Sequence, residues 1–287
     1  MDNNPSWRHH FVPQYYIQNF YGANNELWVY DKEYDKILNR PKVSKSIFFE
    51  PHRNSIFVNE ELTPILEDYF KIIDDKHAKH LGDISLKDKL ELEDSHDYIR
   101  TLTYFANWLL WRIPKYDKLT KDLIVNNFDE INKKYFQSRF SQSKIDDDTI
   151  KIIRTLLPYQ LLVKYDIVVD LKFKIYEIEQ PNFFLTDNPI LIEEHPQLSN
   201  TISCPLLLPI TPTKIFAVLS SDYYTFNLDL IIQMNFEFFH RANKFVASPS
   251  KEHLQNFING YREYKEISDK QSSLCVKNLF ENINKKT

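Results

Sequence analysis

The chain has 287 residues, of which 43 % are apolar and 15 % aromatic, so it can build a sizeable core and is not extensively disordered. Lysine and arginine number 36 against 40 aspartates and glutamates, and a net charge of −4 provides no global basic field to attract nucleic acid. The three glycines lie far apart, which excludes a glycine-rich phosphate loop, and the two cysteines lack the spacing of a disulfide framework or a cysteine-rich zinc site.

The N-terminal residues and the lengths of the apolar runs indicate the cellular location of the protein. Residues 1–6 contain no basic region followed by an apolar stretch, so the sequence predicts no signal peptide. No run reaches the roughly 18 apolar residues that a membrane helix needs. We therefore expect a cytoplasmic protein that has no membrane partner.

The first part of the chain predicts mainly helices. Pro13 suits a first helical turn and begins a short helix over 13–20, and a polar turn between two apolar runs predicts a β-hairpin over 27–38. Residues 41–58 fit neither pattern. Apolar residues at helical spacing then predict helices at 63–81, 95–111, 118–140 and 147–164.

Short runs rich in β-branched and aromatic residues predominate after residue 166. They predict strands at 167–169, 173–176, 183–185, 206–208 and 215–219. A helix at 222–239, a strand at 245–247 and a terminal helix from 252 to about 282 complete the prediction.

The order of these elements predicts the fold class. Helices come first and strands later, which favours an α+β fold over alternating βαβ units. We expect the N-terminal and central helices to pack on a small, mostly antiparallel sheet from the second half, with a helix at the C-terminus. Residues 1–287 would form a single domain that is helix-rich at 60–165, strand-rich at 166–220 and helical again at 250–282.

Two adjacent histidines, His9 and His10, precede the first predicted helix. An imidazole titrates near neutral pH, so either residue is a candidate general acid, general base or metal ligand. The structural alternative is a polar segment whose histidines make only local hydrogen bonds. The sequence leaves both interpretations open.

A second candidate is the segment Thr186-Asp187-Asn188-Pro189, which follows an apolar run. Asparagine before proline disfavours helix, so we expect a sharp turn at the end of a strand. Asp187 would be able to orient a histidine or to act as a base. An Asx turn accounts for the same residues and is, on sequence alone, the more frequent outcome.

Three other polar residues are candidates for substrate binding. Arg112 ends the helix predicted at 95–111, where its guanidinium would clamp a phosphate or simply favour the helix dipole. Arg241 follows a largely apolar predicted helix, which would more often simply expose it to solvent. Gln14 follows the histidine pair and becomes a candidate only through the family resemblance described below.

No metal site is predicted, and the cofactor is left unknown. His77 and His80 are three residues apart on a predicted helix, with Asp74 nearby. The stretch lacks the His-Glu-x-x-His pattern and is rich in charge, so we expect a solvated helix face there.

Four short motifs, taken in chain order, carry a family resemblance. They are His-His-x-Val-Pro-Gln-x-Tyr from His9, Arg-x-Pro from Arg112, Leu-Thr-Asp-Asn-Pro from Leu185 and Pro-x-Thr-Pro from Pro209. Together they resemble domain-of-unknown-function family 4238 over about residues 8 to 250. Thr186 stands where the family typically has serine, which keeps a hydroxyl. The resemblance implies no reaction, but it draws attention to His9, His10, Pro13, Gln14, Arg112, Asp187 and Asn188.

These candidates lead to two hypotheses from different classes. The first is a nuclease or phosphodiesterase, a bacterial toxin or phage-defence effector acting on nucleic acid. In it, His9 or His10 is the general acid or base and Asp187 orients it, while Gln14, Arg112, Asn188 and Arg241 bind the substrate. The second is a non-catalytic interaction or regulatory module, with a protein partner or a second copy of itself, in which the histidines clasp the N-terminus to the Asp187-Asn188 turn. Open imidazoles near Asp187 and Arg112 would favour the first, and buried imidazoles bonded to backbone groups the second.

Overall fold

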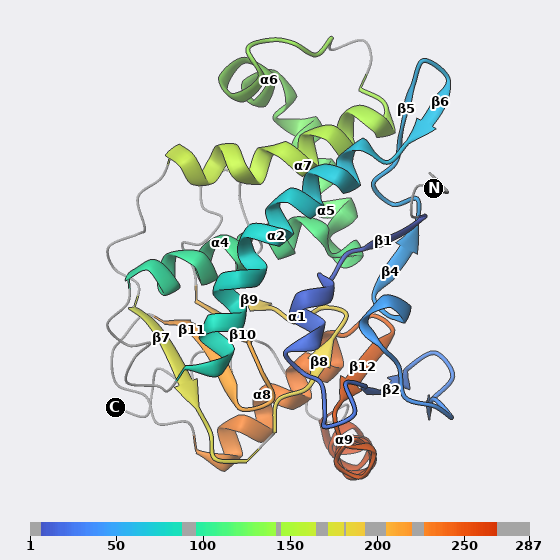
Figure 1. The fold of residues 1–287 in the computed structure, drawn as a ribbon, viewed down its shortest axis with the longest axis vertical. Coiled ribbons are helices and arrows are strands. Elements are labelled where there is room, and N and C mark those ends of the chain that lie inside the picture. Colours follow the sequence, from blue (N-terminus) through green and yellow to red (C-terminus); the bar gives the residue numbers. More distant parts are fainter. Residues whose placement is uncertain are drawn as a thin grey trace.

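The computed structural model describes residues 7–87, 96–141, 145–164, 172–180, 182–192, 205–219 and 227–268. Helices and antiparallel sheets are both present, and the α+β class predicted from the sequence is confirmed (Figure 1). In the described part of the chain, no helix is both long enough and apolar enough to cross a membrane.

The described helices lie close to the predicted positions. They are α1 (Gln14–Gln18), α2 (Ile65–Leu86), α4 (His96–Arg112), α5 (Asp117–Asn126), α6 (Phe128–Phe136), α7 (Asp147–Lys164), α8 (Leu228–Arg241) and α9 (Lys251–Ser268), with 3₁₀ turns η1 (Ser44–Ser46) and η2 (Pro114–Tyr116). Parts of two predicted helices, 222–226 and 269–282, lie outside the described residues, as does the predicted strand at 167–169.

The single helix predicted at 118–140 was wrong, because two helices occupy that stretch. Asn127 separates them with a non-helical backbone, and its side-chain amide donates to the carbonyl of Leu123 at 2.9 Å. Asparagine competes in this way for the free carbonyls at a helix end. The second helix ends at Gln137, whose φ of 54° is left-handed.

The strands form two four-stranded sheets and two two-stranded ones. One large sheet has the order β3-β2-β12-β8 and the other β7-β11-β10-β9, while β1 pairs with β4 and β5 with β6. The strands are β1 (Arg8–His10), β2 (Trp28–Asp31), β3 (Lys36–Ile37), β4 (Phe49–Pro51), β5 (Ile56–Val58), β6 (Glu61–Thr63), β7 (Lys172–Glu177), β8 (Leu185–Thr186), β9 (Leu191–Ile192), β10 (Leu206–Pro209), β11 (Lys214–Leu219) and β12 (Phe245–Ser248).

The expectation of one sheet built from the second half of the chain was therefore incomplete. The predicted N-terminal hairpin, β2 and β3, joins the C-terminal strand β12, with Tyr30 opposite Val246. The segment 41–58, for which no element was predicted, contributes β4 and β5. Strand β4 depends on a distant partner, β1, which local sequence patterns do not reveal, whereas β5 pairs with the adjacent strand β6.

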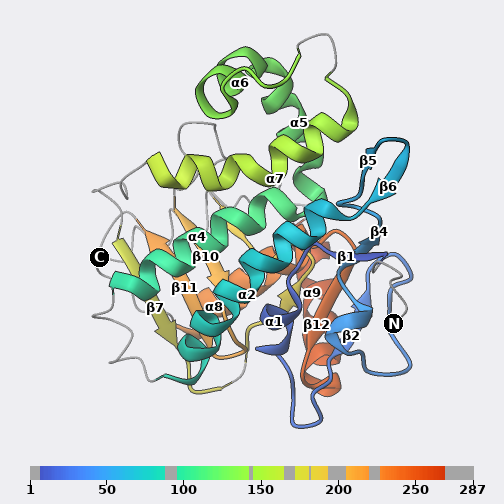
Figure 2. The ribbon, with the colours of Figure 1, turned by 45° about the horizontal axis from the view of Figure 1, so that its top comes forward.

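The sheet β7-β11-β10-β9 is covered on both faces, which explains the uninterrupted apolar runs of its central strands β10 and β11. Alternate residues such as Leu208 and Phe216 face the main core with helices α4 and α7, whereas Leu207 and Ile215 pack with Met234 of α8. Figure 2 shows α2 and α4 crossing one face of this sheet with α8 on the other. Helix α8 also packs toward the second large sheet, since Phe236 and Phe239 share a cluster with α9 and β12.

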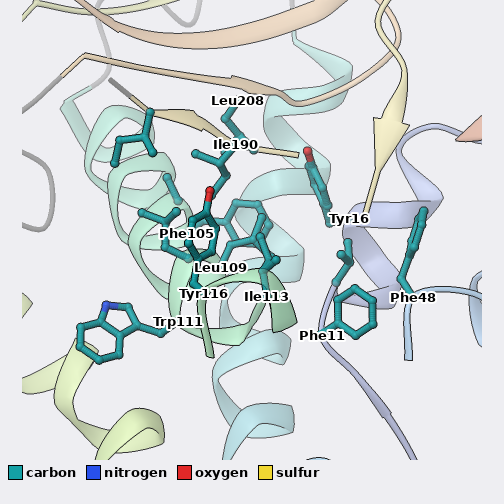
Figure 3. Packing of buried hydrophobic residues seen from close by; sticks show 14 of the residues in the cluster. Phe11, Tyr16, Phe48, Phe105, Leu109, Trp111, Ile113, Tyr116, Ile190 and Leu208 are labelled. Atoms are coloured by element: carbon teal, nitrogen blue, oxygen red, sulfur yellow. The ribbon is translucent and has the colours of Figure 1, made fainter. Parts of the chain in front are cut away.

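Aromatic side chains fasten the N-terminal segment to this core. Tyr16 of α1 packs against Phe105 of α4, with ring centroids 5.0 Å apart, and its hydroxyl donates to the carbonyl of Pro209 at the end of β10. Phe11 and Phe48 lie beside Tyr16 in the same cluster (Figure 3). The segment that carries His9 and His10 is thus an integral strand and helix start instead of a loose tail.

Candidate functional site

His9 is fully buried in β1 and is bonded to the backbone. Its Nδ1 accepts a hydrogen bond from the amide of Asn54 at 2.8 Å, and its ring contacts that of His52 with centroids 6.2 Å apart. Asn54 in turn donates its side-chain amide to Glu67 of α2 at 2.7 Å. His9 therefore anchors the chain just before β5 to the N-terminal strand.

His10 has both ring nitrogens engaged and is also buried. Its Nε2 lies 3.0 Å from the carbonyl of Ser44, so Nε2 carries the proton, and Nδ1 accepts from the side-chain amide of Gln14 at 3.4 Å. Burial, followed by the charge of Arg112, lowers the pKa of His10 from 6.5 to about 4, and the bond to Ser44 opposes this only in part. His10 is accordingly neutral at physiological pH, and Gln14 serves to hold it.

Arg112 is buried at the C-terminus of α4 and is committed to protein partners. It donates to Asp74 of α2 at 2.6 Å and to the carbonyl of His10 at 2.7 Å, and its guanidinium lies 4.5 Å from the ring centroid of Phe70. Its own carbonyl accepts two bonds from Arg53. Arg112 therefore joins α2, α4 and the histidine strand, and Asp74 and His10 engage the two terminal nitrogens that a phosphate clamp would use.

Asp187 binds the backbone that leads from α8 into β12. Its two carboxylate oxygens accept from the amides of Asn243 at 2.7 Å, Lys244 at 2.6 Å and Phe245 at 2.9 Å. Burial raises the pKa of Asp187, and these three amide bonds oppose the increase. The expectation that Asp187 orients a histidine is not met, because its carboxylate is occupied by these amides.

The residue after it, Asn188, meets Lys115 and Arg241 at the end of α8. The carbonyl of Arg241 accepts from Lys115 Nζ at 2.6 Å and from the side-chain amide of Asn188 at 3.3 Å. The side chain of Arg241 reaches back one turn, where its Nε lies 3.8 Å from Glu237. We call these four residues, Lys115, Asn188, Glu237 and Arg241, the α8 cluster.

Glu237 is the most perturbed group of the α8 cluster. Its side chain is only 2 % exposed, and burial raises its pKa from 4.5 to about 7, against the opposing charges of Arg241 and Lys115. Its Oε1 is buried and has no hydrogen-bond partner within the described part of the chain, and the same holds for Oδ1 of Asn188. A carboxyl group that titrates near neutrality beside two cations is suited to proton transfer.

The cationic side of the α8 cluster reaches solvent. Lys115 is exposed and the side chain of Arg241 is 25 % exposed. Partial burial, and then the charge of Arg241, lowers the pKa of Lys115 below its usual 10.5, while Asp187 and Glu237 act in the opposite direction. Burial raises the pKa of Tyr116, the next residue along, and a hydrogen bond with Asn188 works against this.

The predicted residues thus fall into two groups instead of one constellation. His9, His10, Gln14 and Arg112 belong to a buried network around β1, α2 and the end of α4, whereas Asp187, Asn188 and Arg241 surround the end of α8. The 3₁₀ turn η2 connects them, since Arg112 precedes it and Lys115 lies within it.

The face of α2 that was expected to be solvated is partly inward. Asp74 pairs with Arg112, and His77 packs on Phe105 with centroids 6.1 Å apart. Burial raises the pKa of Asp74 to about 6 and lowers that of His77 to about 4. Among the described residues, no group of three or more histidine, cysteine, aspartate or glutamate side chains is arranged to hold a metal ion.

Sequence inspection missed Glu237 and Lys115. Glu237 lies between Phe236 and Phe238 in an aromatic run, and a charged residue at such a position is a signal that burial with partners is to be expected. Lys115 offered no such signal, because its role depends on where η2 meets the end of α8.

Comparison with known proteins gives one family and no individual relative. A family model described as a protein of unknown function (DUF4238) matches residues 8–252. No curated protein and no solved structure matches the chain.

Proposed function

Because the chain belongs to the DUF4238 family, whose description assigns no activity, we propose a function from the structure. It is that of a phosphodiesterase-type hydrolase that acts on nucleic acid and has its chemistry at the α8 cluster. The observation that carries the proposal is Glu237. Its buried carboxyl group lies next to Arg241 and Lys115 and has a pKa of about 7. A general acid or base works best when its pKa is close to the working pH.

Each member of the α8 cluster has a role in this scheme. Glu237 transfers the proton. Lys115 and Arg241, which reach solvent, bind the phosphate and stabilise its charge in the transition state. Asn188 offers a side-chain carbonyl to which no described residue donates a hydrogen bond. The histidine pair is a structural clasp in this scheme, and a bacterial toxin or phage-defence effector is the biological role that such an activity would serve.

The test compares the two groups of residues in one assay. Wild-type protein is incubated with labelled RNA and DNA oligonucleotides, and cleavage is measured per folded molecule. Glu237→Gln should lower the rate by about 10²- to 10⁴-fold, the usual contribution of a general acid or base. His9→Ala and His10→Ala should keep the wild-type rate at temperatures where they remain folded. The opposite pattern would return the chemistry to the histidine pair.

A second candidate function, a non-catalytic interaction module, is favoured by one specific observation. The β5–β6 hairpin carries exposed apolar side chains, with Phe57 65 % and Leu62 44 % exposed, and its base is tied to His9 through Asn54. A buried clasp that holds an exposed apolar hairpin suits protein binding. Absence of any nuclease activity in the wild-type protein, together with loss of a partner in Phe57→Ser but not in Glu237→Gln, would select this function.

A further inference from the structure

The two buried oxygens of the α8 cluster define what a ligand must supply. Oε1 of Glu237 and Oδ1 of Asn188 are hydrogen-bond acceptors, and neither has a donor among the residues that the structure describes. Glu237 is 1 % exposed and Asn188 is fully buried. A phosphodiester carries only acceptor oxygens at neutral pH, so a phosphate group alone would leave Glu237 Oε1 and Asn188 Oδ1 without a hydrogen-bond donor. The complementary ligand has an O–H or N–H donor.

The two cations of the cluster require a different ligand group at the same place. Lys115 Nζ and the Asn188 amide both bind the carbonyl of Arg241, so these three residues converge within two hydrogen bonds. Glu237 Oε2 lies 3.8 Å from Arg241 Nε, so the unpaired Oε1 of the same carboxyl group is also close to the cations. The ligand is therefore expected to carry an anionic group within a few covalent bonds of its hydrogen-bond donor.

A ribose 2′-hydroxyl next to a 3′-phosphodiester meets both requirements. Building on the proposed function, we infer that the substrate is RNA and that the α8 cluster cleaves it through the 2′-hydroxyl, with Glu237 as general base and Lys115 and Arg241 on the phosphate. DNA has the phosphate but lacks the donor, and the 2′-hydroxyl is the group by which a protein distinguishes the two.

The step balances without any co-reactant. The 2′-oxygen forms a bond to phosphorus as its proton passes to the Glu237 carboxylate, and the bond from phosphorus to the 5′-oxygen breaks. The Lys115 ammonium gives a proton to the leaving 5′-oxygen, while Arg241 stabilises the charge on the phosphate oxygens. The products are a 2′,3′-cyclic phosphate and a 5′-hydroxyl end, and proton exchange with water restores Glu237 and Lys115.

The charged groups around Glu237 set the expected pH dependence. Arg241 faces it from α8, Lys115 from η2, and Asp187 lies near Lys115 in the turn after β8. Because Glu237 must be ionised, the rate should rise with pH through about 7. It should fall again where Lys115 loses its proton, below that residue's usual 10.5. The profile is therefore bell-shaped.

The experiment uses the full chain and three matched oligonucleotides in the presence of EDTA. One is RNA, one is the same RNA with a 2′-O-methyl group at every nucleotide, and one is the DNA of the same sequence. We expect cleavage of the RNA alone, with cyclic phosphate ends identified by mass spectrometry. Glu237→Gln and Lys115→Met should each lower the rate by about 10²-fold or more. Lys121→Met removes a lysine that is 52 % exposed and pairs with Asp147, and should match the wild type.

Each adverse result is distinguishable. Equal cleavage of DNA or of 2′-O-methyl RNA, if abolished in Glu237→Gln, would overturn the RNA inference and leave the proposed hydrolase in place. Cleavage of RNA that Glu237→Gln and Lys115→Met do not slow would remove the chemistry from the α8 cluster. Failure of the wild-type protein to cut any of the three would overturn both proposals.

Discussion

Single residues in this protein show how burial and hydrogen-bond partners decide the meaning of a reactive side chain. His10 has the chemistry of a general base, yet Ser44 and Gln14 occupy both of its nitrogens. Glu237 has one oxygen, Oε1, that receives no hydrogen bond from any residue in the described ranges. A group whose bonding capacity is exhausted within the fold contributes to stability, whereas one held with unused capacity is available to a ligand.

The hydrogen bonds of His10 should contribute to the stability of the fold. His10→Ala leaves the carbonyl of Ser44 and the amide of Gln14 without their buried partner. The free energy of unfolding should fall by about 1–3 kcal/mol, the cost of an unsatisfied buried polar group. Urea denaturation measures this, with His80→Ala, an exposed histidine on α2, as the control. Equal stability of the two variants would argue against a clasp.

At the scale of elements, the junction between α8 and β12 depends on the turn after β8. Strand β8 pairs with β12, and Asp187 then binds three successive amides at the start of that strand. Asn188 binds the last carbonyl of α8. Lys32 adds three more bonds to carbonyls at the end of this helix. The end of a helix needs such donors, since its last carbonyls have no partner within the helix.

Replacing Asp187 tests this junction. Asp187→Ala removes the acceptor for three amides and should lower the free energy of unfolding by at least about 2 kcal/mol. Hydrogen exchange at residues 243 to 245 should accelerate in the folded protein, because those amides lose protection. Asp187→Asn, which keeps one acceptor oxygen, should have a smaller effect on both measurements. Unchanged exchange at these amides in Asp187→Ala would show that the junction is held by other contacts.

At the scale of the whole molecule, a buried ionisable group couples stability to pH. The pKa of Glu237 is raised from 4.5 to about 7 in the folded state, so the folded protein holds this proton more tightly than the unfolded chain does. The stabilisation is present below pH 4.5 and is lost as the pH rises through about 7. Above that pH, the ionised carboxyl group lowers the stability of the folded protein relative to its value at acidic pH.

Glu237→Gln should therefore be the more stable protein at alkaline pH. With 1.36 kcal/mol for each pKa unit, the variant is expected to gain on the order of 3 kcal/mol at pH 8. At pH 4.5 it should equal the wild type, because Glu237 is then protonated in the fold. Denaturation at both pH values measures the difference, and Glu252→Gln, an exposed position on α9, serves as the control. A gain that is the same at both pH values would refute the linkage.

Local patterns were sufficient for most helices and for the fold class. The apolar stripe of α4 and the acidic start of α7 appear directly in the sequence, because a helix satisfies its backbone within itself. The strands β10 and β11 also follow from their apolar runs. The strand β1 was missed because its partner, β4, lies some forty residues away along the chain. The hairpin β5–β6 is local, but its turn residues, Asn59 and Glu60, lack the glycine that usually marks a two-residue turn.

The sequence by itself determined the residue types at the candidate site and the family to which the chain belongs, but only the tertiary structure decided their roles. In the sequence alone, His10 and Asp187 are compatible with a single catalytic site. In the fold, backbone groups of Ser44, Asn54 and residues 243–245 occupy the side chains of the histidines and Asp187. Glu237 acquires its raised pKa from burial, and the cations that arrive with η2 and the end of α8 oppose that increase only in part. Burial and long-range hydrogen bonds are properties of packed elements, so no local pattern specifies them.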